Sequence, residues 1–135
     1  AVWHADMTYL ELPPKAGILY ALEVPENQGN THFANMSLAY SDLSDDIKEK
    51  IDENILIHDA AHNSAGILRK GYSEVDNPTE TPGARHPMVI TDKSTNKKLL
   101  FLGRRPHAYI VGLEIEESEN LLDEIWEHAT QEKYT

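Results

Sequence analysis

The chain has 135 residues, of which 23 are acidic and 12 are basic, so its formal net charge is −11 when the histidines are neutral. That length fits one domain, and the acidic charge argues against a nucleic-acid groove and against binding to an anionic membrane surface. With 40% hydrophobic residues and no cysteine, the sequence predicts a folded core without disulfides or sulfur-ligated metals. Any metal would be held by His, Asp or Glu side chains.

The first part of the chain favours strands and turns. Residues 2–12 mix β-branched and aromatic side chains and end at Pro13-Pro14, which predicts a short strand. Residues 18–24 are the longest apolar stretch and predict a buried strand. They fall far short of the roughly 20 residues that cross a bilayer, so no membrane span is expected. Turn-forming residues 25–30 then separate this strand from a second one at 31–34.

The middle of the chain predicts two short helices, a strand and a long loop. Asn35 can cap a helix that runs through Tyr40, and Ser44, followed by two aspartates, can cap a second helix. Residues 55–58 read Ile-Leu-Ile-His and predict a strand. Residues 63–83 are polar, rich in Gly and Pro and without a period, which predicts a loop long enough to be functional or disordered.

The last part predicts a hairpin and a helix. Residues 86–91 and 98–102 read as two strands joined by a polar tip at 92–97. A helix is expected to begin near Glu116, because acidic residues favour a helix N-terminus. Its apolar residues form one stripe that faces a core: Leu121, Leu122, Ile125, Trp126 and Ala129.

The pair with the clearest chemical meaning is His4 and Asp6. On a strand, side chains two residues apart point to the same side, so an imidazole nitrogen and a carboxylate oxygen can reach one cation. A chain with this composition contains about one His-x-acid pair by chance. The alternative is therefore a histidine on a half-buried strand beside a solvated aspartate.

The residues around this pair carry a family resemblance. The segment Trp3-His4-Ala5-Asp6-Met7-Thr8-Tyr9 and the later segment Gly29-Asn30-Thr31-His32-Phe33, with 24 residues between Asp6 and Thr31, resemble the TauD/TfdA family of Fe(II)- and 2-oxoglutarate-dependent dioxygenases. Gln28 stands where the family pattern has its first glycine. Further segments follow in family order over the rest of the chain: His86–Val89, Leu100–Gly103, Ile110–Gly112 and Leu121–Thr130.

The resemblance implies a fold and a binding site. The expected fold is β-rich α+β: a distorted jelly roll, the double-stranded β-helix of the clavaminate synthase-like type, with flanking helices and incomplete here. Residues 1–135 would form one partial dioxygenase domain. His4 and Asp6 would be two of three iron ligands, and Thr31 would hydrogen-bond the distal carboxylate of 2-oxoglutarate. Otherwise Thr31 is an ordinary strand residue. No side chain is expected to act as a catalytic acid or base.

The family also has a third ligand, a histidine, and an arginine that pairs with 2-oxoglutarate. Both lie within or after a Trp-Asp-Asn-Arg-x-x-x-His segment, which this sequence lacks. We therefore expect a truncated piece of a longer enzyme that is inactive alone and prone to aggregate at unpaired strand edges.

Four residues are predicted to lie near the substrate by family position: Asn63, Ser64, Arg104 and Arg105. Either arginine is a rare positive charge on an acidic chain and could bind a carboxylate, sulfonate or sulfate. The alternative is a solvated pair in a loop. The aromatic residues that sulfonate-binding members use at these places are missing, which argues against taurine.

The resemblance implies a dioxygenase that converts 2-oxoglutarate to succinate and CO2 while hydroxylating a small, anionic organic substrate. Its partners would be that substrate and dioxygen, without nucleic acid or membrane. A cytoplasmic location is expected, and a homo-oligomer is left open. The competing readings are a non-catalytic β-rich binding module and an inactive remnant without metal. A zinc hydrolase is disfavoured, since neither a third ligand nor a general base is evident.

Overall fold

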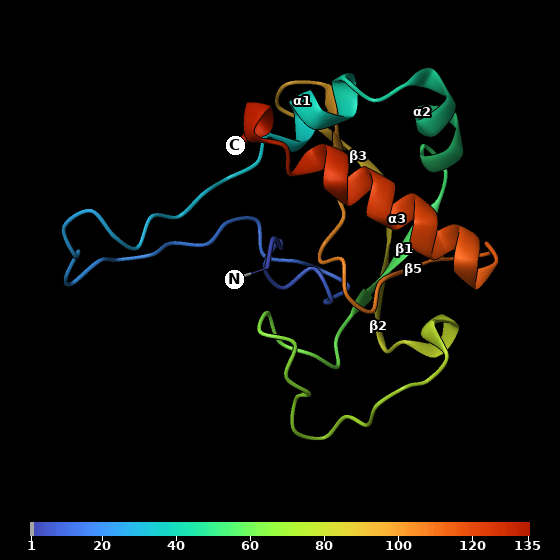
Figure 1. Ribbon diagram of the computed structural model, residues 1–135, viewed down its shortest axis with the longest axis horizontal. Coiled ribbons are helices and arrows are strands. Elements are labelled where there is room, and N and C mark those ends of the chain that lie inside the picture. The colour runs from blue at the N-terminus through green and yellow to red at the C-terminus, as the bar shows by residue number, and fades with distance from the viewer. Residues whose placement is uncertain (1) are drawn as a thin grey trace.

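Figure 1 shows the protein as a computed structural model, which describes residues 2–135. The helices and strands in chain order are α1 Met36–Ser41, α2 Asp45–Ile51, β1 Ile55–Asp59, β2 Gly83–Pro87, β3 Val89–Asp92, β4 Lys97–Leu100, β5 Tyr109–Ile110 and α3 Ile115–Ala129. Two single 3-10 turns add Pro78–Glu80 and Glu132–Tyr134. None of the helices within residues 2–135 has the length and apolar character needed to cross a bilayer.

Two small antiparallel sheets form the β structure. Strand β1 is central in the first sheet, which has the order β2, β1, β5, and Leu56 lies opposite both His86 and Ile110. Strands β3 and β4 form a separate hairpin. Helix α3 crosses this body (Figure 1) and packs its buried face on a core shared with α1, β1, β4 and β5. The core thus fixes β1, whose end carries the polar residues described below.

The helices form where the sequence predicts them. Asn35 Oδ1 accepts a hydrogen bond from Leu38 N at 3.0 Å and begins α1, and Ser44 Oγ accepts from Ile47 N at 3.4 Å and begins α2. All five residues of the predicted apolar stripe on α3 are buried. The strand expected at 55–58 is also confirmed as β1, and residues 63–82 form a long loop broken by one 3-10 turn.

The predicted strand at 86–91 is in part wrong. The structure divides it at Met88 into β2 and β3, which belong to different sheets. The reason is that Met88 is fully buried and its two backbone hydrogen bonds go to different partners. Its N–H donates to the Asn54 carbonyl, and its carbonyl accepts from Phe101 N. The short strand β5 was not predicted, because two residues carry no period.

The predicted strands before residue 35 are wrong. Residues 2–12 contain only a single bridge, between His4 and Arg104, followed by turns. Residues 18–24 and 31–34 lie in an extended arm, residues 13–34, that projects from the body (Figure 1). Ile18 is 95% exposed. No strand within residues 2–135 pairs with the arm, and an apolar segment is buried only where another element supplies a surface.

The arm gives the first testable prediction. Trypsin is expected to cut this chain first after Lys15, which is exposed and outside any hydrogen-bonded ladder, because proteases attack segments that need little local unfolding. Lys98 lies within β4 and forms an ion pair with Asp52 at 2.6 Å, so cleavage there should be slower. Mass spectrometry of an early digest measures the order. Cleavage at Lys98 before Lys15 would contradict the exposed arm.

Candidate metal centre and cavity

His4 and Asp6 lie against each other although they are not on a strand. His4 Nε2 is 3.2 Å from Asp6 Oδ1, and His4 Nδ1 donates to the Val2 carbonyl at 2.7 Å. Because a carbonyl oxygen only accepts, a proton sits on Nδ1, and Nε2 faces the carboxylate either as the second N–H of an imidazolium or, in the neutral ring, with its lone pair. A lone pair and a carboxylate oxygen repel each other unless a proton or a cation lies between them. The donor set therefore fits a divalent cation with nitrogen and oxygen ligands.

The segment that carries the pair is attached at both ends. Ala5 N donates to the Gly103 carbonyl at 2.7 Å, and His86 Nε2 donates to the Leu10 carbonyl at 3.0 Å. Between these anchors, Met7 adopts the left-handed region with φ 56°, which turns the chain directly after Asp6. The turn and the two anchors supply the same-side placement that the sequence attributed to a strand.

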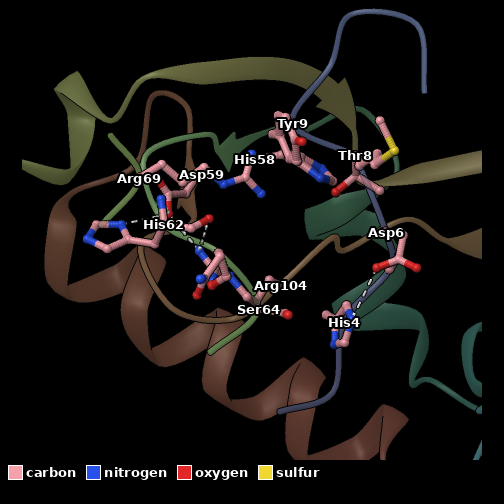
Figure 2. A pocket seen from close by; sticks show the side chains of 13 residues that line it. His4, Asp6, Thr8, Tyr9, His58, Asp59, His62, Ser64, Arg69 and Arg104 are labelled. Carbon is pink, nitrogen blue, oxygen red and sulfur yellow. Dashed lines mark hydrogen bonds and ion pairs between the residues drawn. The ribbon is translucent and has the colours of Figure 1, made fainter. Parts of the chain in front are cut away.

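A cavity of about 150 Å³ opens beside the pair. Figure 2 shows His4 and Asp6 on one side of it and Asp59, His62 and Arg104 on the other. Within residues 2–135 no group of three or more His, Cys, Asp or Glu side chains is placed to hold a metal ion. The pair accordingly supplies two ligands, and none of the described residues joins them as a third.

Opposite the pair lies a buried ionic cluster that the sequence did not predict. Asp59 Oδ2 accepts from Arg104 Nη2 at 2.7 Å and from His62 Nδ1 at 2.9 Å, while Asp59 Oδ1 accepts from Ala61 N at 2.8 Å. The side chains of Asp59 and His62 are only 2% and 5% exposed. His62 Nε2 lies 3.1 Å from Glu74 Oε2, which ties the long loop to the segment that follows β1. The one local signal was the i, i+3 spacing of Asp59 and His62.

Three of the four predicted substrate residues line the cavity: Asn63, Ser64 and Arg104. Asn63 uses its side chain to accept from the backbone of Ala65 and Ile67, and Ser64 is exposed. The Arg104 guanidinium is held by Asp59 and by the carbonyl of Asn63. A buried carboxylate therefore already pairs with the Arg104 charge, and the role of Arg104 toward a substrate stays a prediction.

Arg105 lies outside the cavity. Its guanidinium pairs with Glu119 at 2.7 Å and with Asp123 at 2.6 Å, both on α3. The structure therefore does not bring Arg105 together with the other predicted substrate residues. Its place indicates that it joins the loop after β4 to the helix.

Thr31 is also not brought to His4 and Asp6. It is exposed on the arm and does not line the cavity beside the pair. A second cavity, of about 140 Å³, lies on another side of His4 and is lined by the neighbouring His32 and Phe33, again without Thr31. Its cofactor role stays a prediction.

His58, on β1, also lines the cavity and was given no role by sequence reasoning. It is 2% exposed, and neither ring nitrogen has a hydrogen-bond partner in residues 2–135. The ring centres of His58 and His86 lie 5.1 Å apart in an edge-to-face arrangement. The absence of a side chain at Gly103 makes space for His58, because a Cβ there would collide with His58 Nδ1. Burial, with a smaller contribution from the charge of His86, lowers the pKa of His58 from 6.5 to about 4. The imidazole is therefore neutral at pH 7.

Antiparallel strands that carry a polar cavity and a His-x-Asp pair are features expected of the jelly-roll, 2-oxoglutarate-dependent dioxygenases. Comparison with known families supports that class: the family model "Taurine catabolism dioxygenase TauD, TfdA family" matches residues 1–135. The chain belongs to the TauD/TfdA family.

Individual relatives and solved structures agree. The chain is 31% identical over 133 residues to the alpha-ketoglutarate-dependent 2,4-dichlorophenoxyacetate dioxygenase of Burkholderia sp. (strain RASC), covering 98% of this chain and 44% of that protein. It is 34% identical to the (S)-phenoxypropionate/alpha-ketoglutarate-dioxygenase of Sphingobium herbicidovorans, covering 96% of this chain and 46% of the relative. The chain therefore spans less than half the length of these curated relatives.

Among solved structures, AAD-2 in complex with Mn(II) and N-oxalylglycine matches with a TM-score of 0.75 at 27% identity, covering 98% of this chain and 52% of that one. A taurine dioxygenase from Burkholderia xenovorans matches with a TM-score of 0.74 at 30% identity, covering 98% and 42% of the two chains. The predicted fold class is confirmed: the strands and flanking helices form part of the jelly roll of this family.

Proposed function

We propose that the protein is a non-haem Fe(II)- and 2-oxoglutarate-dependent dioxygenase that hydroxylates a small organic anion and releases succinate and CO2. The observation that carries the proposal is the geometry of His4 and Asp6. His4 Nε2 faces a carboxylate oxygen of Asp6 at 3.2 Å, and Nδ1 is fixed by the Val2 carbonyl. The two atoms are placed close enough to chelate one cation.

The roles of the residues follow from their chemistry. His4 Nε2 and Asp6 would hold Fe(II). When bound, this ion would activate dioxygen with 2-oxoglutarate as the co-substrate. The anchors at Gly103 and Leu10 hold the two ligands in a fixed relation. Neither ligand needs to act as an acid or a base, because both use lone pairs on the metal.

The proposal extends to the partners. A small organic anion and dioxygen would be the substrates, and Thr31 would bind 2-oxoglutarate. The names of two relatives, which act on 2,4-dichlorophenoxyacetate and phenoxypropionate, support an organic acid as substrate. We further propose that residues 1–135 form one partial domain of a cytoplasmic protein that binds neither nucleic acid nor membrane. Homo-oligomerisation is left open.

Two measurements test the function. The protein that contains residues 1–135 is expected to bind Fe(II) under argon and, once dioxygen is admitted, to release succinate from 2-oxoglutarate. Asp6→Ala and His4→Ala should each lower the affinity for Fe(II) at least tenfold, because each removes one of two donors. Asp45→Ala, an exposed acid on α2, is the matched control and should leave binding unchanged.

A non-catalytic binding module makes the opposite prediction. In that case the Asp6→Ala and Asp45→Ala variants would bind iron equally or not at all. No succinate would form. Either result would reject the dioxygenase proposal.

A further inference from the structure

The cavity contains one arginine whose charge is not used. Two guanidinium groups and two aspartates line it, and Arg104 is already paired with Asp59. Arg69 has no carboxylate within ion-pair distance in residues 2–135, whereas Asp6 belongs to the pair with His4. On a chain with a net charge of −11, a cationic side chain inside a cavity without an acidic partner needs an explanation.

Arg69 is held in place by contacts other than an ion pair. Its guanidinium carbon lies 4.1 Å from the centre of the Tyr9 ring, and its backbone N–H donates to the Ala61 carbonyl at 2.7 Å. Stacking on an aromatic ring orients the planar guanidinium while leaving its N–H donors free. Tyr9 is itself fixed, since its carbonyl accepts from Ala84 N at 3.1 Å. The guanidinium is thus positioned before any ligand binds.

His58 gives a second and independent indication of a ligand. A neutral imidazole has one N–H donor and one acceptor nitrogen, and both are buried without a partner in residues 2–135. Leaving such groups unpaired destabilises the folded state, so an unpaired polar group in a cavity wall indicates a bound partner. His58 lines the same cavity as Arg69.

We propose that Arg69 and His58 bind the anionic group of the substrate, with Arg69 supplying charge and two parallel N–H donors and His58 one neutral donor. This inference rests on the proposed function for the identity of the substrate. It deepens that function by moving substrate recognition away from Arg104 and Arg105. The oxyanion is a carboxylate or a sulfonate, since both accept two parallel N–H bonds. A volume of about 150 Å³ admits this group with only a few carbon atoms beside it.

The test measures anion binding without iron, so that the metal pair does not contribute. Propionate and methanesulfonate are titrated into the purified protein with EDTA present, and binding is followed by NMR. Both anions should bind, and the one with the lower Kd identifies the preferred oxyanion, whereas the neutral propionamide should not bind. Arg69→Gln should weaken binding at least tenfold and Arg69→Lys less. Arg85→Gln, an exposed arginine on β2 outside the cavity, should have no effect.

His58→Leu should weaken anion binding severalfold. In the unsubstituted protein, the ¹⁵N resonances of the labelled His58 imidazole should shift when the anion is added, and this measurement does not depend on the folding of the variant. Absence of binding to either anion, or equal binding by the Arg69→Gln and Arg85→Gln variants, would overturn the proposal. Loss of iron binding with intact anion binding would reject the dioxygenase function alone, because the two assays share no ligand.

Discussion

Replacing Asp59 with asparagine is expected to lower the free energy of unfolding by about 3 to 5 kcal/mol. The carboxylate is 2% exposed, and one of its oxygens accepts from both Arg104 and His62. Removing its charge leaves the Arg104 guanidinium, which is 11% exposed, without its counter-charge. A loss of this size is a large part of the 5 to 15 kcal/mol that stabilises a typical domain. Urea denaturation at pH 7 measures it.

The matched control is Asp123→Asn. Asp123 also pairs with an arginine, at 2.6 Å from Arg105, but its side chain is 70% exposed. Solvent screening limits such a pair to about 0 to 1 kcal/mol. The double variant Asp59→Asn with Arg104→Gln should recover part of the loss, because it removes the unpaired charge. If Asp59→Asn costs no more than Asp123→Asn, the cluster does not stabilise the fold.

Sequence reasoning located the elements whose signals are local. Helix α3 has an apolar stripe at helical spacing, α1 and α2 begin at capping side chains, and β1 is a short apolar run between polar segments. In each case the residues that form the pattern are also those that form the hydrogen bonds or the buried face. Tertiary contacts then agree with local preference.

Sequence reasoning failed where contacts with residues distant in the sequence determine the local structure. The stretch at 18–24 has the composition of a buried strand, yet burial needs a second surface, and none of the described residues supplies one. Met88 interrupts an apolar run because its backbone bonds to Asn54 and Phe101, which the run itself does not reveal. Pairing partners are not encoded in the alternation of one segment.

The candidate site shows the same division. The His-x-Asp spacing identified two side chains that do meet, although a left-handed turn at Met7, not a strand, places them together. The pairing of Arg104 with Asp59 was not predicted, because the two residues lie 45 positions apart in the sequence. The orphaned nitrogens of His58 depend on burial by Gly103 and its neighbours, which no local pattern records.

The second large effect is a pH dependence caused by His58. Burial lowers the pKa of this imidazole from 6.5 to about 4, so between these values the unfolded chain binds a proton that the folded chain does not. The sign follows directly: this contribution to stability is fully present above pH 6.5 and is lost as the pH falls toward 4. Its full size is about 3 kcal/mol, because each unit of pKa difference corresponds to about 1.4 kcal/mol.

His58→Leu should remove this part of the pH dependence. At pH 7 the free energy of unfolding of the variant is expected to lie within about 1 kcal/mol of that of the original protein, since leucine removes two unpaired polar atoms and has a similar volume. At pH 4.5 it should be the more stable of the two. Carboxylates that titrate in this range affect both proteins equally, so the difference between the two stability curves isolates His58. Parallel curves from pH 7 to 4.5 would mean that His58 is protonated in the fold and has a partner, in which case it offers no free donor to an anion.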